Sequence, residues 1–174
     1  MENSELFKLG FLVPGPPERR VVLLSPELNA LVSEPWVDSL KAERCARLRA
    51  DLENILAGER LVVCWEPFKA GKRHQIGRLD PVQDDIFDIR SMDPSPGLRV
   101  LFHFAEKDVL VLHVCNPRSV KVSWLSRLPL GEGSSKAWRK ATAESRTRWT
   151  TLFPRYEPHH GDDIHDYLSN AVLS

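Results

Sequence analysis

The segment from residue 85 to residue 119 carries the side chains of this sequence that are best suited to proton transfer and phosphate chemistry. An arginine guanidinium keeps its charge at any working pH, and its rigid fork of donors matches the oxygens of a phosphate. Carboxylate and imidazole groups can accept or donate a proton. The candidate catalytic residues are therefore Asp88, Arg90, Arg99, His113 and Arg118.

Asp88 and Arg90 stand two positions apart in a strand-like pattern. In "IFDIR", Phe87 and Ile89 alternate with them, and a period of two places both charged side chains on one face of a strand. On that face Asp88 is either a proton acceptor or the group that holds Arg90 in place. The alternative is a surface ion pair, which contributes about 0–1 kcal/mol and has no function.

Arg99 and His113 lie on the two strands expected to follow. Arg99 belongs to "LRVLFHF", the central strand, where an unpaired arginine is uncommon and therefore favours a function. His113 lies in the apolar run "VLVLHV", where a lone imidazole is more typical of a satisfied core residue than of a catalyst. His103 has a similar apolar context.

Two basic clusters are candidates for contact with RNA, because lysine and arginine neutralise backbone phosphates. Residues 60–150 hold 16 basic and 10 acidic side chains, although the whole chain has 24 of each. A solvated helix face explains the cluster around residue 139 equally well. The candidate RNA-binding residues are Lys72, Arg73, His74, Lys121, Arg139 and Lys140.

The first half of the chain predicts one strand and two helices. The run "VVLL" at 21–24 indicates a strand, and Ser25 with Pro26 is typical of a helix start, here a helix ending near residue 33. A longer helix is expected from residue 36 to just before Gly58. Its apolar side consists of Leu40, Leu48, Leu52, Ile55 and Leu56. Residues 59–84 are expected to be largely loop with at most one short strand, because glycines, a proline and basic residues interrupt them.

The second half predicts a meander and one more helix. "IFDIR", "LRVLFHF" and "VLVLHVCN" are separated by the turns "MDPSPG" and "AEKD", which indicates three antiparallel strands. A further short strand is an option after Pro117. A basic helix is expected from Ser134, with Trp138, Ala141, Ser145 and Trp149 along one side.

Composition limits the class of protein. The odd number of cysteines, three without a CxxC spacing, and a start that lacks the order of a signal peptide indicate a reducing, cytoplasmic location. No apolar run approaches the roughly 20 residues that span a bilayer, so no membrane partner is expected. The "HHGDDIHD" segment has metal-binding residue types without a defined ligand spacing, so neither a metal nor a cofactor is expected.

The order strand, helix, helix, three-strand meander, helix resembles the RelE/ParE superfamily of small bacterial toxins, in particular its HigB-like and phage Gp49-like branch. The resemblance rests on "DIFDIR", "GLRVLFHF" and "CNPRS" and covers about residues 20–150. It implies an α+β fold in which two N-terminal helices and a C-terminal helix pack on a small antiparallel RelE-like sheet. That sheet would consist of the N-terminal strand and the three-strand meander. The expected domains are an arm at 1–18, the toxin domain at 19–150 and a C-terminal extension at 151–174.

The resemblance also implies a function. Toxins of this type are usually ribosome-dependent, metal-independent mRNA endonucleases held inactive by an antitoxin, often a helix-turn-helix protein. Arg99 and Arg118 match the family's phosphate-facing arginines, Arg90 matches the arginine before the turn, and Asp88 falls where members carry a carboxylate or a lysine. Two alternatives stay open. One is a ParE-like toxin that blocks DNA gyrase, and the other is a non-catalytic protein-interaction module.

Overall fold

One mixed sheet of eight strands organises the chain. The structure is a computed structural model that describes residues 5–33, 39–67, 74–95, 97–117 and 132–174. Its strands are β1 (Phe7–Lys8), β2 (Val21–Leu24), β3 (Leu61–Cys64), β4 (Ile76–Arg78), β5 (Phe87–Ser91), β6 (Leu98–Glu106), β7 (Val109–Pro117) and β8 (Ala171–Leu173). Its helices are α1 (Pro26–Ser33), α2 (Ser39–Leu56), α3 (Glu132–Leu152) and α4 (Ile164–Tyr167), with a 3-10 turn at Val82–Asp84.

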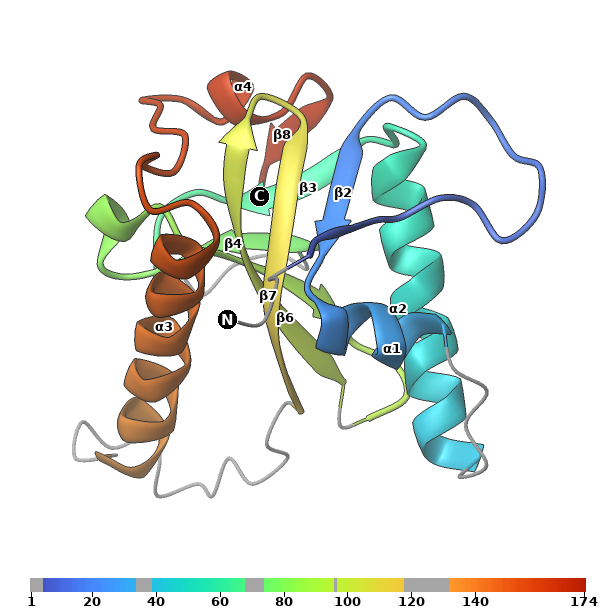
Figure 1. The fold of residues 1–174 in the computed structure, drawn as a ribbon, viewed down its shortest axis with the longest axis horizontal. Coiled ribbons are helices and arrows are strands. Elements are labelled where there is room, and N and C mark those ends of the chain that lie inside the picture. Colours follow the sequence, from blue (N-terminus) through green and yellow to red (C-terminus); the bar gives the residue numbers. More distant parts are fainter. Residues whose placement is uncertain (1–4, 34–38, 68–73, 96, 118–131) are drawn as a thin grey trace.

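The strands lie in the order β1-β2-β7-β6-β5-β4-β3-β8 (Figure 1). The central meander β5-β6-β7 is antiparallel, and β4 joins β5 in the same sense. Strand β2 runs parallel to β7, and β3 runs parallel to both β4 and β8. The sheet therefore surrounds an antiparallel centre with parallel pairs on both sides.

The predicted small antiparallel RelE-like sheet is wrong. The three strands of the meander are present as expected, but the sheet has eight strands and includes parallel pairs. Residues 59–84, expected to be largely loop, contribute both β3 and β4. These strands have four and three residues, too short for their periodicity to stand out beside the glycines and basic residues around them.

The ends of the first two helices follow the predicted signals. The Oγ atom of Ser25 accepts a hydrogen bond from the backbone N–H of Leu28, and Pro26 is the first residue of α1. Gly58 follows α2 with a φ of 76°, a left-handed conformation that favours glycine. A Cβ atom there would lie 2.6 Å from Cβ of Arg19, so glycine also allows this close approach.

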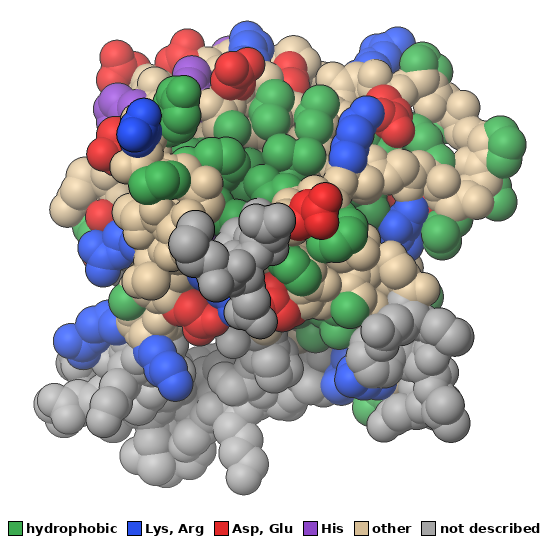
Figure 2. All heavy atoms as spheres, in the orientation of Figure 1, with side chains coloured by type: hydrophobic (Ala, Val, Ile, Leu, Met, Phe, Trp, Pro, Cys, Tyr) green, Lys and Arg blue, Asp and Glu red, His purple; other side chains and the backbone are tan. Residues whose placement is uncertain are grey.

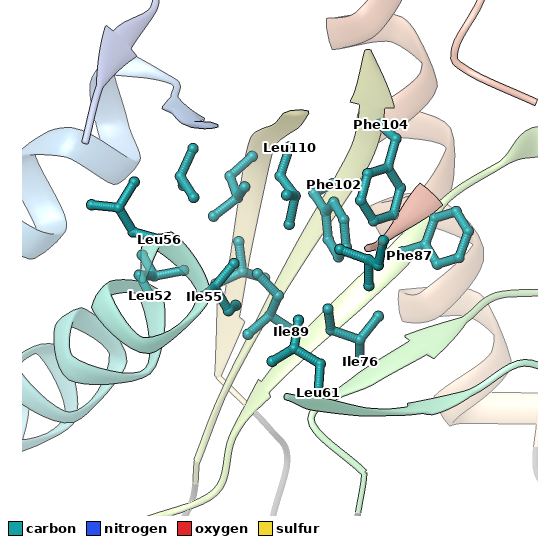
Figure 3. Close-up of a cluster of buried hydrophobic side chains, with 14 of the residues drawn as sticks. Leu52, Ile55, Leu56, Leu61, Ile76, Phe87, Ile89, Phe102, Phe104 and Leu110 are labelled. Atoms are coloured by element: carbon teal, nitrogen blue, oxygen red, sulfur yellow. The ribbon is translucent and has the colours of Figure 1, made fainter. Parts of the chain in front are cut away.

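The main hydrophobic core lies between α1, α2 and one face of the sheet (Figure 3). Helix α2 contributes Leu48, Leu52, Ile55 and Leu56, all at most 2% exposed. The strands contribute alternate residues, which explains the period of two seen in the sequence. They include Phe87, Ile89, Val100, Phe102, Phe104, Leu110 and Leu112. Leu40, expected on the apolar side of this helix, is instead 44% exposed.

Helix α3 packs on the opposite face of the sheet. Its Trp138 and Ala141 contact a smaller cluster with Leu79, Leu101 and Val114. Figure 2, seen from this side, shows hydrophobic side chains gathered between α3 and β2, so the helix covers only part of this face. The sheet is therefore covered unequally, by two helices on one face and by one on the other (Figure 1).

The residues after position 150 belong to the same sheet and core. Strand β8 pairs with β3, and Ile164, Tyr167, Leu168 and Ala171 are buried in the main core. The domain boundaries at 18 and 150 stay predictions, but the segment beyond 150 is packed against the sheet. In the described ranges, no helix combines the length and the apolar character needed to cross a membrane.

A buried arginine connects distant parts of this fold. Arg20 is 2% exposed, and its Nε lies 3.1 Å from Oδ1 of Asp108. Its terminal nitrogens donate to the carbonyl oxygens of Ile55, Glu59 and Asn170 at 3.2, 3.0 and 3.1 Å. Burial lowers the pKa of Arg20, and the contact with Asp108 opposes this shift. One guanidinium thereby ties together the end of α2, the β6–β7 hairpin and the start of β8.

Candidate functional site

Strands β5 and β6 position three of the five candidate catalytic residues. In their antiparallel register Asp88 lies opposite Leu101, and Arg90 lies opposite Arg99. Because side chains alternate along a strand, Asp88, Arg90 and Arg99 share a face with Leu101. Leu101 packs in the cluster beneath α3, so the three charged residues lie on the α3 side of the sheet.

The carboxylate of Asp88 lies between two guanidinium groups. Its Oδ2 atom is 2.9 Å from Nε of Arg90 and 3.1 Å from Nε of Arg99. The side chain of Asp88 is 0% exposed, whereas those of Arg90 and Arg99 are 23% and 22% exposed. A buried carboxylate is unfavourable unless it is paired. The two arginines provide this compensation and still reach the surface.

Gly77 on the neighbouring strand leaves room for the His74 imidazole beside Asp88 and Arg90. Gly77 lies opposite Asp88 on β4. A Cβ atom at Gly77 would lie 2.6 Å from Oδ1 of Asp88, 3.1 Å from Nη2 of Arg90 and 3.3 Å from Nε2 of His74. The three side chains therefore converge over a backbone position that has room only for glycine. We call Asp88, Arg90, Arg99, His74 and Gly77 the Asp88 cluster.

The second oxygen of Asp88 is not saturated. Oδ1 is buried and accepts no hydrogen bond from the part of the chain that the structure describes. A buried acceptor in this state costs about 1–3 kcal/mol, and such groups are often found at functional sites. The imidazole of His74 stands on the same side, and an imidazole can accept or donate a proton. The cluster therefore combines a net charge of about +1 from its two arginines and one carboxylate with a proton-transfer group.

Helix α3 also contributes to the cluster. The guanidinium of Arg99 lies over the ring of Trp138, 4.8 Å from its centroid. Stacking on an indole fixes the plane of a guanidinium and adds a cation–π attraction. Trp138 lies on the side of α3 that faces the sheet and also packs against the smaller hydrophobic cluster. The same ring thus anchors α3 and orients Arg99.

A groove of about 520 Å³, walled in part by Ile55 and Ile89 of the α2 side, reaches two residues of the cluster but neither Asp88 nor Arg99. Both His74 and Arg90 line it, together with Gln75 and Met92. Its other wall comes from the last turns of α2 and the start of β3. A groove of this size is in the range of sites that bind a small molecule or a nucleotide unit.

His113 is not part of the Asp88 cluster. Its Nε2 atom lies 3.1 Å from Nδ1 of His103, and both imidazoles are 1% exposed. The ring of Trp149 packs against both, with centroids 5.2 Å from His103 and 6.1 Å from His113. His113 therefore belongs to a buried imidazole pair beneath α3.

Burial keeps this pair neutral. It lowers the pKa of His103 to about 4, although Asp85 opposes the shift. Burial also lowers the pKa of His113 to about 3, with smaller contributions from His103 and Arg148. Neither imidazole is therefore a proton acceptor near neutral pH.

The candidate RNA-binding residues are divided. Arg139 and Lys140 are exposed on α3, directly after Trp138. His74 belongs to the Asp88 cluster. The other three candidate RNA-binding residues and one candidate catalytic residue lie outside the described residues, so their roles stay predictions. These residues are Lys72, Arg73, Lys121 and Arg118.

A second polar cluster fixes the residues after position 150. Oδ1 of Asp85 accepts hydrogen bonds from the hydroxyl of Tyr167 at 2.7 Å and from Nη2 of Arg78 at 2.9 Å. Oδ2 of the same carboxylate lies 2.7 Å from Nδ1 of His160. Desolvation and the bond to Asp85 raise the pKa of Tyr167 above its usual value. One of the histidines in "HHGDDIHD" is thus engaged by the body of the protein.

The described ranges contain no group of three or more His, Cys, Asp or Glu side chains arranged to bind a metal ion. Cys45, Cys64 and Cys115 are free thiols. Desolvation raises the pKa of Cys115 to about 12, with a smaller contribution from Cys45. Burial thus makes Cys115 a poor nucleophile, because the thiolate is the reactive form.

Sequence reasoning missed Gly77 and the second role of Trp138. A single glycine inside a short strand is a known signal for close approach to the backbone, but β4 itself was not predicted. The stacking of Trp138 on Arg99 depends on how α3 lies across β6, and no local pattern encodes that contact.

The comparisons with known proteins leave the family open. No family model, no curated protein and no solved structure matches the chain. The resemblance to RelE/ParE toxins therefore stays a prediction that rests on the residues of the meander.

Proposed function

We propose that this chain is an RNA endonuclease that works without a metal, the toxin of a toxin–antitoxin pair, and that the Asp88 cluster is its active site. One observation carries the proposal. Two partly buried arginines converge on a single buried carboxylate next to an imidazole, and one of these arginines, Arg90, lines a groove together with that imidazole. Such an arrangement fits a phosphodiester better than it fits a purely structural ion pair, because the guanidinium groups remain partly accessible.

The proposed roles follow from position. Arg90 and Arg99 bind the non-bridging phosphate oxygens and stabilise the charge that grows in the transition state. Asp88 is a positioning residue, because its side chain is fully buried and holds both arginines through Nε. His74 is the general base.

In the proposed reaction the ribose 2′-oxygen attacks phosphorus while His74 takes the 2′-hydroxyl proton. The bond from phosphorus to the 5′-oxygen breaks, and the leaving oxygen receives a proton from solvent. The products are a 2′,3′-cyclic phosphate and a 5′-hydroxyl end. Only RNA provides the internal nucleophile, so DNA should bind without being cut.

The biological setting is part of the proposal. The target would be mRNA on the ribosome, which places the protein in the cytoplasm, and a helix-turn-helix antitoxin would cover the same groove. Exposed Arg139 and Lys140 on α3 extend the basic surface from the cluster and would contact flanking phosphates.

The test is induced expression in bacteria followed by mapping of mRNA ends. The wild-type chain should stop growth and leave cuts with 5′-hydroxyl ends, whereas Arg99→Ala and His74→Gln should fold and lose toxicity. Arg146→Ala is the matched control, because Arg146 pairs with Asp84 on the exposed side of α3. Growth arrest with intact mRNA and DNA breaks would instead indicate a gyrase-blocking toxin. Normal growth with a folded wild-type chain would indicate a non-catalytic protein-interaction module.

A further inference from the structure

A cavity of about 580 Å³ lies apart from the Asp88 cluster, between α1, α2, the end of β7 and α3. No residue of the cluster lines it. Apolar side chains form much of its wall, among them Leu28, Leu31, Leu98 and Val114. A volume of this size, with mostly apolar walls, is typical of a small-molecule site.

Two buried polar atoms in the lining residues lack a partner in the described part of the chain. One is Nδ1 of His113, on a residue that is 1% exposed and whose other ring nitrogen contacts His103. The other is Nε of Arg44 on α2. Buried polar atoms are normally hydrogen-bonded, so two such atoms around one cavity indicate a missing polar partner.

The charges of the lining indicate the sign of that partner. Glu27 and Glu144 both pair with Arg148, at 2.9 and 3.2 Å, so this arginine is neutralised. The described residues form no ion pair with Arg44. The lining as a whole has three cations, Lys41, Arg44 and Arg148, against two carboxylates. One negative charge on a ligand would therefore balance the cavity.

We propose that this cavity binds a small amphipathic monocarboxylate, with its apolar chain among the leucines and its carboxylate on Arg44 and His113. A guanidinium binds a carboxylate through paired, charge-assisted hydrogen bonds. A dianion such as a phosphate monoester would leave one charge uncompensated in an apolar space. Because the imidazole pair is neutral near pH 7, His113 contributes a hydrogen bond rather than a charge.

The proposal is tested by isothermal titration of the full chain with octanoate and with 1-octanol, its neutral analogue. Octanoate should bind about tenfold more tightly than octanol, because only the acid engages Arg44. Arg44→Gln should remove this difference by weakening octanoate alone. Arg47→Gln is the matched control, because Arg47 lies on the same helix but lines the other groove and pairs with Asp51.

Two further measurements keep the outcome decisive. Octanoate should shift the ¹⁵N resonances of the His113 imidazole, and Leu31→Phe, which fills the apolar wall, should weaken both ligands. Circular dichroism would confirm that each variant is folded. Absence of octanoate binding by the folded wild type would overturn the proposal. Equal affinity for the two ligands, or an unchanged affinity in Arg44→Gln, would overturn it as well.

Discussion

Arg20 on one side, and Arg90 and Arg99 on the other, show two ways in which the same sheet holds an arginine side chain. The Arg20 side chain is 0% exposed and donates to Asp108 and to three backbone carbonyls. Arg90 and Arg99 share one carboxylate oxygen and remain about a fifth exposed. Arg20 is therefore fully buried and uses four of its five N–H donors inside the protein, while the Asp88 cluster keeps contact with the surface.

The difference separates a structural arginine from a binding arginine. A fully buried guanidinium that uses most of its donors inside the fold has little to offer a ligand. A guanidinium that pairs with a carboxylate through Nε and stays partly exposed is oriented and still accessible, which is what recognition of a phosphate requires. Deep burial alone would select Arg20 as the candidate for a functional arginine. Partial exposure beside a buried carboxylate selects Arg90 and Arg99 of the Asp88 cluster instead.

The largest expected effect on the free energy of unfolding comes from replacing Arg20, the fully buried arginine. Arg20→Met keeps the length of the side chain but removes the hydrogen bonds of the guanidinium to three carbonyls and to the Asp108 carboxylate. We expect a loss of about 3–5 kcal/mol in the free energy of unfolding, measured by urea denaturation. Arg47→Met, at a residue with a 55% exposed side chain, is the control and should change stability little. A loss below 1 kcal/mol in Arg20→Met would remove the distinction between the two arginine types.

A smaller effect is expected where the Asp88 cluster meets the backbone. In Gly77→Ala the new methyl group would lie 2.6 Å from Oδ1 of Asp88 and displace the carboxylate. We expect a loss of about 2 kcal/mol from overpacking together with a loss of RNA binding in fluorescence anisotropy. Gly10→Ala is the matched control, because its nearest contact would be an ordinary 3.8 Å to Glu18. Unchanged RNA affinity in a folded Gly77→Ala protein would argue against the cluster as the binding site.

The neutral pair His103 and His113 extends the comparison to pH. Because the folded protein holds both pKa values near 4 and 3, the unfolded chain binds more protons below about pH 6.5. Stability should therefore be complete above pH 6.5 and fall as the pH decreases towards 4. We expect about 2 kcal/mol less stability for each of the two imidazoles at about pH 5 than at neutral pH, measured by urea denaturation. In His113→Gln the slope should be shallower, and an equal slope would show that other groups cause it.

The smallest effect is expected at an exposed pair. Arg146 and Asp84 lie 3.2 Å apart, with the arginine side chain 52% exposed. Arg146→Ala should change the free energy of unfolding by no more than about 0.5 kcal/mol, because solvent screens such pairs. Thermal unfolding at two salt concentrations would check this, and a loss similar to that of Gly77→Ala would show that exposure does not distinguish the arginines.

The part of the fold that the sequence predicts is its local part. Helices α1, α2 and α3 and the meander were expected because amphipathic periodicity and capping residues act over a few positions. At most one short strand was expected where both β3 and β4 lie, because these strands are short and lie beside glycines and basic residues. The parallel pairing of β2 with β7 was missed for a different reason, since it joins segments that no local pattern connects.

The site divides in the same way. Strand alternation predicted Asp88 and Arg90 as candidate catalytic residues, and its place on the central strand predicted Arg99. The structure brings the three together as two ion pairs. His74 was selected only as a basic residue, and its place beside Asp88 depends on β4 lying next to β5. No local sequence pattern predicts the role of Arg20, because its hydrogen-bond partners lie 35 to 150 positions away.

That spacing has a consequence for folding kinetics. The Arg20 guanidinium can complete its hydrogen bonds only when partners 35, 39, 88 and 150 positions away have all arrived. Contacts of such long sequence separation form late, because each requires the closure of a long loop. We therefore expect the arginine to stay hydrated in the folding transition state and to form its hydrogen bonds after the rate-limiting step. Losing them should accelerate unfolding and leave the folding rate almost unchanged.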